Sequence, residues 1–329
     1  MTLRIAVLGA GRIGQVHAKT VAASADAELV AVADAFAEAA DKLAAQWDCA
    51  VGEVDVLIND AAIDAIIICT PTDTHADLIE QAARAGKAIF CEKPIDLNAD
   101  RVRACLEVVE QSQAKLMVGF NRRFDPHFAA LECAVRGGAV GEVEQVIITS
   151  RDPAPPPVEY IKRSGGLFRD MMIHDFDMAR FLLGEEPVSV SAVGSALADP
   201  SLSGIDVDTA TAVLTTSSGK QAVITNSRRA SYGYDQRAEV HGSAGMASMD
   251  NPRVTSLQTA NAAGYTVEPL HDFFMTRYTE AYANELSSFV RWVGTGQGDV
   301  PSGLDGLKAL MLADAAEASL SSGKQERVE

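Results

Sequence analysis

The first 120 residues alternate between short apolar runs and longer segments with helical periodicity. The apolar runs are continuous and end at Gly, Pro or polar residues, which is typical of buried parallel strands. They lie at residues 4–8, 29–33, 66–69, 88–91 and 115–118. The helical segments lie at residues 12–23, 36–46, 74–85 and 99–112. This alternation predicts a doubly wound parallel sheet with right-handed crossovers.

The pattern changes after residue 119. Residues 151–157 contain four prolines, which are incompatible with regular structure. Strand-like runs follow at residues 188–193, 209–216, 221–226, 237–241 and 265–268, and helical patterns lie at residues 171–183, 273–293 and 304–320. We therefore predict two domains. Residues 1–120 form a parallel-sheet domain, and residues 121–329 form an α+β domain with a large, mostly antiparallel open sheet.

Composition and charge exclude several classes of partner. The chain is 47% hydrophobic and 22% charged, with a net charge of −17. Nucleic acids and anionic membranes bind basic surfaces, so we expect neither as a partner. The apolar run at residues 3–8 is too short for a signal peptide, and no run reaches the roughly 20 residues of a membrane-spanning helix. Five cysteines and six histidines show no metal-ligand spacing, so we expect a cytoplasmic protein without a metal.

A glycine-rich turn separates the first predicted strand from the first predicted helix. Residues 9–14 are Gly-Ala-Gly-Arg-Ile-Gly, which is a G-x-G-x-x-G spacing. Gly9 permits the tight turn, Gly11 lets the backbone approach a pyrophosphate, and Gly14 lets helix and strand pack closely. The helix N-terminus adds free amides and a positive dipole for the phosphates. Within a βαβ unit, this turn predicts a Rossmann domain that binds a dinucleotide.

An acidic residue ends the second predicted strand. Asp34 follows the apolar residues 29–33. A carboxylate at this position can accept both hydroxyls of an adenosine ribose and would repel a 2′-phosphate. No arginine follows immediately to bind such a phosphate, so we expect NAD rather than NADP. The alternative is that Asp34 only caps the next helix.

A lysine follows the fourth predicted strand, in the sequence Glu92-Lys93-Pro94. Parallel strands end at one edge of the sheet, where open α/β folds bind their ligands. A lysine at that edge can hydrogen-bond a substrate hydroxyl and stabilise developing alkoxide charge. The alternative is a solvated surface lysine, which is the commoner state of such a residue.

An acid and a histidine lie four residues apart, at Asp170 and His174. On one helix the two side chains would share a face. The carboxylate would then orient the imidazole and stabilise its protonated form. Such a pair can remove a proton from an alcohol while hydride leaves the carbon. The spacing alone is equally compatible with a capping carboxylate beside a structural histidine.

Four motifs together resemble the Gfo/Idh/MocA family of dehydrogenases. They are the glycine turn with residues 15–18, the Pro-Thr-Asp-Thr-His segment at 71–75, Glu92-Lys93-Pro94, and Asp170 with His174-Asp175. The resemblance implies that Lys93, Asp170 and His174 are catalytic. It also implies that Arg123, Asp152 and Tyr234 line a polyol pocket. The expected cofactor-binding residues are Gly9, Gly11, Arg12, Ile13, Gly14, Asp34, Thr70, Pro71, Thr72, His75, Glu92 and Lys93.

Within this family, residues 120–126 and 232–237 resemble the inositol 2-dehydrogenases. This resemblance implies oxidation of a cyclic polyol, with myo-inositol converted to 2-keto-myo-inositol by hydride transfer to NAD. Another inositol isomer or a pyranose sugar stays open as substrate, because the loop at residues 151–157 could select the isomer. A non-catalytic NAD-binding regulator is the alternative from another class, although all three catalytic residues are present. The resemblance further implies a homotetramer formed through the open sheet of the second domain.

Overall fold

The structure is a computed structural model that describes residues 2–328 and divides into two compact units. Unit 1 contains the chain up to Phe124 together with Glu280–Leu310. Unit 2 contains Asp125–Thr279 and the segment from Met311 onward. The sequence predicts a single boundary after residue 120, whereas the structure returns Glu280–Leu310 to unit 1. The reason is a helix of that segment whose apolar side chains belong to the core of unit 1.

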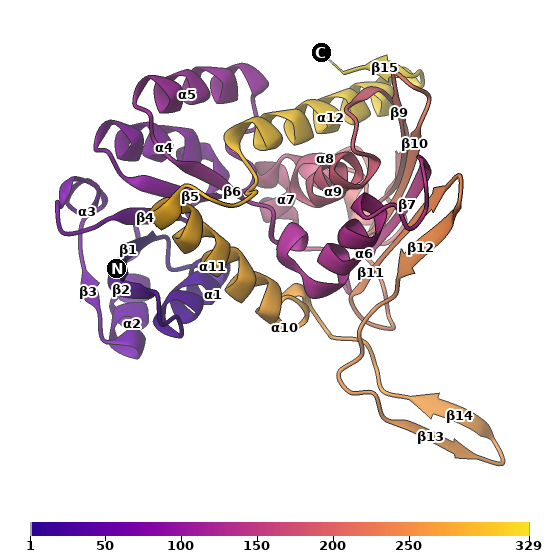
Figure 1. The fold of residues 1–329 in the computed structure, drawn as a ribbon, viewed down its shortest axis with the longest axis horizontal. Coiled ribbons are helices and arrows are strands. Elements are labelled where there is room, and N and C mark those ends of the chain that lie inside the picture. Colours follow the sequence, from indigo (N-terminus) through magenta and orange to yellow (C-terminus); the bar gives the residue numbers. More distant parts are fainter. Residues whose placement is uncertain (1, 329) are drawn as a thin grey trace. The chain divides into compact units, whose positions relative to one another are not determined.

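Unit 1 is built on a six-stranded sheet in the order β3-β2-β1-β4-β5-β6, and every neighbouring pair is parallel (Figure 1). The strands are β1 (Leu3–Leu8), β2 (Ala27–Ala33), β3 (Ala50–Val51), β4 (Ala65–Ile68), β5 (Ala88–Glu92) and β6 (Leu116–Gly119). The predicted Rossmann sheet is confirmed, and only the short, exposed β3 lacks a predicted apolar run. The strand order reverses between β1 and β4, which is where open α/β sheets bind ligands.

Helices cover both faces of this sheet (Figure 1). They are α1 (Arg12–Ala22), α2 (Ala37–Trp47), α3 (Val54–Asn59), α4 (His75–Arg84), α5 (Ala99–Gln111) and α11 (Thr279–Thr295), with short 3-10 turns η1 (Thr72–Thr74) and η2 (Asn121–Phe124). The helices predicted within the first 120 residues are confirmed nearly residue for residue. A further helix, α12 (Gly303–Ser322), begins in unit 1 and ends in unit 2.

The helix α11 contributes core side chains to unit 1. Leu286 and Phe289 are buried in the same apolar cluster as residues of β1, β2 and α1. The ring of Phe289 meets Phe90 of β5 edge-on, with 5.8 Å between the centroids. Burying a side chain of this kind contributes about 1.5–3 kcal/mol. The prediction of one continuous helix at residues 273–293 is wrong, because Tyr278 leaves the helical conformation between α10 (Phe274–Arg277) and α11.

Unit 2 is built on a seven-stranded sheet in the order β12-β11-β7-β10-β9-β8-β15. The strands are β7 (Val143–Arg151), β8 (Pro187–Ser195), β9 (Thr209–Thr216), β10 (Gln221–Ser227), β11 (Asp235–Gly242), β12 (Gly245–Met249) and β15 (Glu326–Arg327). Only β7 and β10 pair in parallel, so the predicted mostly antiparallel sheet is confirmed. The run at residues 265–268 was expected in this sheet, but it belongs to a separate hairpin of β13 (Gln258–Asn261) and β14 (Gly264–Val267) that projects from unit 2 (Figure 1).

Helices lie on one face of the sheet of unit 2 (Figure 1). They are α6 (Pro126–Arg136), α7 (Val158–Ser164), α8 (Gly166–Asp170), α9 (Ile173–Leu183) and the C-terminal part of α12. Unit 2 also contains the short helix α10 and the 3-10 turn η3 (Pro200–Leu202). Alternate residues of β9 are buried, as expected for a strand covered on one face only. The opposite face of the sheet carries Val213 and Thr211 of β9, paired with Val223 and Thr225 of β10. These side chains are only partly buried.

The helix α11 also places a carboxyl group inside unit 1. Glu285 is fully buried, and neither of its carboxyl oxygens has a hydrogen-bond partner among residues 2–328. Burial raises the pKa of Glu285 well above its ordinary value of 4.5, and the nearby carboxylate of Glu92 raises it further. Burial without a hydrogen-bond partner therefore favours the neutral form of the Glu285 carboxyl group.

Replacing Glu285 with Gln should make the stability of the protein less dependent on pH. Because the folded-state pKa of Glu285 is raised, the folded state binds more protons than the unfolded state above pH 4.5, and stability falls as pH rises toward the folded pKa. The loss is about 1.4 kcal/mol per pH unit, and the glutamine variant lacks it. Urea unfolding of both proteins between about pH 5 and pH 9 measures the difference. Glu280→Gln, an exposed change on α11, is the control, and parallel curves for wild type and Glu285→Gln would contradict a raised pKa of Glu285.

Candidate active site

The glycine turn brings β1 and α1 closer together than any larger residue would permit. Gly9 has a φ of +100°, and a Cβ there would lie 2.5 Å from the carbonyl oxygen of Cys69. A Cβ on Gly14 would lie 1.8 Å from the carbonyl oxygen of Gly9. Both contacts are far inside van der Waals distance, so glycine is required at the two positions.

Gly11 differs from these two glycines because the space in front of it is open. A Cβ on Gly11 would meet nothing within 4 Å, and the residue is exposed. The first helical hydrogen bond of α1 runs from the Gln15 N–H to the Gly11 carbonyl at 3.0 Å, so the amides between them have no acceptor within the helix. An open backbone at a helix N-terminus suits a pyrophosphate. The residues present therefore fit a dinucleotide.

Asp34 lies directly beside this turn. One carboxylate oxygen accepts the Ala10 N–H at 2.6 Å, and the other accepts the Phe36 N–H at 2.8 Å. Each oxygen keeps a second lone pair that could accept a ribose hydroxyl. The following helix, α2, begins without a side-chain cap, so the alternative role of Asp34 as a helix cap is not supported.

The loop after β4 is held by its own polar groups. The Thr70 and Thr74 hydroxyls are 2.6 Å apart, and the Thr74 hydroxyl donates to the Pro71 carbonyl at 2.8 Å. His75 is buried, and both of its ring nitrogens lie within hydrogen-bond distance of backbone carbonyls, those of Thr70 and Pro94. The two ring nitrogens are therefore already used inside unit 1.

Glu92 and Lys93 end β5 in different surroundings. Glu92 is buried, and its carboxylate lies 2.7 Å from Nε2 of His17 on α1. No spacing rule could have paired His17 with a residue 75 positions away in the sequence. Lys93 is half-buried and lies at the carboxyl edge of the sheet, where a substrate could reach it.

Asp170 is held by two side chains that sequence reasoning missed. The Tyr160 hydroxyl donates to one carboxylate oxygen at 3.0 Å, and the Arg228 guanidinium donates to the other at 3.2 Å. Arg228 is almost completely buried. These two hydrogen bonds fix the orientation of the Asp170 carboxylate.

The spacing suggests that Asp170 and His174 share one helix, but the structure places them on two. Asp170 is the last residue of α8, and His174 is the second residue of α9. Met171 and Met172 form the turn between the two helices. His174 is half-buried, and the next residue, Asp175, is fully buried.

The predicted substrate residues lie in different local settings. Arg123 in unit 1 pairs with Asp305 at 3.0 Å. In unit 2, the Asp152 N–H donates to the Ser227 carbonyl at 2.9 Å. Tyr234 is only 5% exposed and packs edge-on against the ring of Tyr278 at 5.9 Å.

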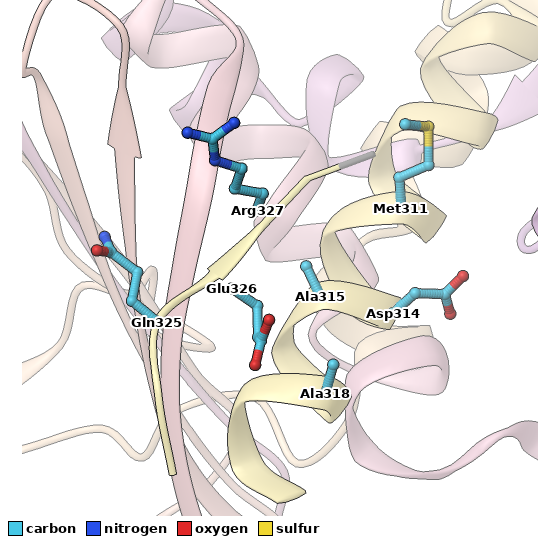
Figure 2. A pocket seen from close by; sticks show the side chains of 7 residues that line it. All are labelled: Met311, Asp314, Ala315, Ala318, Gln325, Glu326 and Arg327. Carbon is cyan, nitrogen blue, oxygen red and sulfur yellow. The ribbon is translucent and has the colours of Figure 1, made fainter. Parts of the chain in front are cut away.

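An open pocket of about 440 Å³ in unit 2 contains none of the predicted site residues. It lies between α12 and β15 and is lined by Met311, Asp314, Ala315, Ala318, Gln325, Glu326 and Arg327 (Figure 2). The side chains around it are of mixed polarity, and Asp314 already pairs with Arg169 at 2.8 Å.

Residues 2–328 contain no group of three or more His, Cys, Asp or Glu side chains placed to hold a metal ion. Within the same residues, every helix is too short or too polar to cross a lipid bilayer.

Comparison with known proteins identifies the family. The profile described as "Oxidoreductase family, NAD-binding Rossmann fold" matches residues 3–120, and the profile "GFO/IDH/MocA C-terminal domain" matches residues 128–248. The inositol 2-dehydrogenase of Rhizobium meliloti is 63% identical over 326 residues, which cover 99% of each chain. The myo-inositol 2-dehydrogenase of Thermotoga maritima is 43% identical over 332 residues, again covering 99% of each.

A solved structure of a protein with a related name has the same fold as this chain. The scyllo-inositol dehydrogenase of Lactobacillus casei, with bound NAD(H) and scyllo-inositol, superimposes with a TM-score of 0.93 at 29% identity, covering 100% of this chain and 99% of that one. The fold and the sequence thus lead to the same family. The protein belongs to the GFO/IDH/MocA family of oxidoreductases and carries the family's NAD-binding Rossmann domain.

Proposed function

We propose that the protein is an NAD-dependent inositol 2-dehydrogenase that oxidises myo-inositol to 2-keto-myo-inositol. The observation that carries this proposal is identity over nearly the whole chain with relatives of that name. The residues needed for the chemistry, Lys93, Asp170 and His174, are all present. A regulator that only binds NAD would have no use for them.

The proposed roles of these residues follow from their chemistry. When bound, NAD⁺ supplies a hydride acceptor. His174 accepts the proton of the substrate hydroxyl, and Asp170 orients the imidazole and stabilises its protonated form. Lys93 hydrogen-bonds the same oxygen and stabilises the negative charge that develops on it. Tyr160 and Arg228 support this assignment, because they hold the Asp170 carboxylate in place.

The proposed cofactor site lies in unit 1. Its residues, which contact the cofactor or support residues that do, are Gly9, Gly11, Arg12, Ile13, Gly14, Asp34, Thr70, Pro71, Thr72, His75, Glu92 and Lys93. The open backbone at Gly11 and the carboxylate of Asp34 beside the glycine turn support this set. We propose that Arg123, Asp152 and Tyr234 contribute to binding of the polyol.

A second candidate substrate is another inositol isomer. The Lactobacillus casei relative is named for scyllo-inositol, so the family scaffold accepts more than one arrangement of ring hydroxyls. A pyranose sugar would require the same catalytic residues. Residues 152–157 form no helix or strand, and we assign selection of the isomer to the loop at residues 151–157.

We also propose a cytoplasmic homotetramer. Five cysteines without a disulfide suit a reducing compartment. The uncovered sheet face of unit 2, with Val213, Val223 and the exposed Ile147, supports assembly, because sheet faces with this much apolar surface are generally covered in a stable protein.

A substrate panel tests the proposed function. The purified protein is mixed with NAD⁺ and myo-inositol, scyllo-inositol, chiro-inositol or glucose, and the absorbance of NADH is followed. Fast turnover of myo-inositol is the expected result. Turnover of a different polyol instead would change the assigned substrate but not the proposed roles of the catalytic residues. Tight NAD⁺ binding without any turnover would contradict the enzyme and favour a regulator.

Lys93→Ala should bind NAD⁺ as the wild type does and lose most of its turnover. Removal of a group that stabilises charge on oxygen typically lowers kcat by about 10²- to 10³-fold. Single-turnover rates and NAD⁺ titrations separate the two effects. Lys42→Ala, at an exposed position of α2, is the control and should change neither. Unchanged kcat in Lys93→Ala would remove the lysine from the mechanism.

Asp34→Asn should weaken the preference for NAD⁺ over NADP⁺. The change removes the charge that repels a 2′-phosphate and weakens acceptance of the ribose hydroxyls, by about 10- to 100-fold in relative kcat/KM. The ratio of kcat/KM for the two cofactors measures the preference directly. Asp26→Asn, an exposed change just before β2, is the matched control. An unaltered ratio in Asp34→Asn would show that this carboxylate does not select the cofactor.

A further inference from the structure

His75 lies where two strand ends of unit 1 come together. It is the first residue of α4, and it is only 2% exposed. Its Nε2 lies 2.7 Å from the Thr70 carbonyl oxygen, and its Nδ1 lies 2.8 Å from the Pro94 carbonyl oxygen. Thr70 belongs to the loop after β4, and Pro94 follows Lys93 after β5. Because β4 and β5 are neighbouring parallel strands, one ring connects the two loops that follow them.

Whether both contacts can be hydrogen bonds depends on how many ring nitrogens of His75 carry a proton. A carbonyl oxygen only accepts hydrogen bonds, and a neutral imidazole has a single N–H. The protonated ring can therefore donate to both carbonyls, and the neutral ring can donate to only one. In either form, one nitrogen faces the loop after β4 and the other faces the segment that carries Lys93.

The surroundings of His75 act on its charge in both directions. Burial lowers the pKa of His75 below its ordinary value of 6.5; the two carbonyls and Glu92 raise it, and Lys93 lowers it. Asp77, also on α4, is paired with Arg101 of α5. The second donated hydrogen bond is thus present at acid pH and lost as pH rises through the lowered pKa.

We propose that His75 is a positioning residue. Its Nε2 holds the loop after β4 that contains Thr70, here called the cofactor loop, and its Nδ1 holds the segment after β5 that contains Lys93 and Pro94. The proposal rests on the proposed function, because that function assigns cofactor binding to the cofactor loop and catalysis to Lys93. It differs from a direct contact with the cofactor, because both polar atoms of the ring act on backbone carbonyls inside unit 1. The two nitrogens should therefore be separable by their effects on catalysis.

Two substitutions separate them. The amide of Asn reaches about as far as Nδ1, and the amide of Gln reaches about as far as Nε2. In His75→Asn, which keeps only the Pro94 contact, KM for NAD⁺ should rise about tenfold while kcat stays near the wild-type value. In His75→Gln, which keeps only the Thr70 contact, kcat should fall about tenfold or more while KM for NAD⁺ is retained.

The controls distinguish positioning from a general loss of structure. His127→Asn and His127→Gln alter an exposed histidine of α6 and should change neither constant. Thermal unfolding of all variants checks that they are folded. Equal changes of KM and kcat in both His75 variants, or wild-type kinetics in both, would overturn the proposal.

Failure of the proposed function would be visible in the wild-type protein, which would then turn over no polyol. Calorimetry of NAD⁺ binding still tests His75 in that case. Weaker binding in His75→Asn than in His75→Gln is the expected result. Equal affinities in the two variants would overturn the role of Nε2 at the cofactor loop.

Discussion

The contact between Gly14 and Gly9 is the constraint on which unit 1 depends. A Cβ on Gly14 would lie 1.8 Å from the Gly9 carbonyl oxygen, so α1 approaches β1 this closely only because residue 14 is glycine. This approach directs the open N-terminus of α1 to the carboxyl edge of the sheet. Gly14 and His17 are three residues apart and share a helix face, so the same approach brings His17 to Glu92. A single steric requirement therefore determines both the cofactor turn and the polar contact beside Lys93.

Glu92 and Lys93, at the end of β5, point to opposite sides of the chain and so lie in different surroundings. Successive residues of a strand point to opposite faces, so Glu92 is buried beside His17 while Lys93 reaches the partly exposed edge. The nearby Glu285 would add a second negative charge to this interior, and burial together with the Glu92 carboxylate raises the pKa of Glu285, which disfavours that charge.

Local patterns predicted those parts of the fold that local physics decides. The apolar runs of β1, β2, β4, β5 and β6 can be recognised from residue type alone. The contact between Gly9 and Gly14 arises within a segment of six residues, so the glycine turn can also be recognised from the local sequence. The partners of Asp170 could not be predicted, because Arg228 lies 58 positions away and becomes its partner only through the fold of unit 2. The same holds for the buried ion pair of Asp125 and Arg277, which are 152 positions apart. Helix breaks were also missed, since residues 273–293 keep a helical apolar pattern across the turn at Tyr278.

The break between α8 and α9 changes how the acid–histidine pair is held. On one helix, the distance between Asp170 and His174 would follow from helix geometry alone. Here each residue has its own support: Asp170 is bound by Tyr160 and Arg228, and α9 is fastened to the sheet through Asp175. The Asp175 carboxylate accepts from Ser150 of β7 at 2.5 Å and from Asn226 of β10 at 2.9 Å, all within the buried interior of unit 2. Asp170 and α9 are therefore each held by contacts of their own within unit 2, and their positions do not depend on a shared helix.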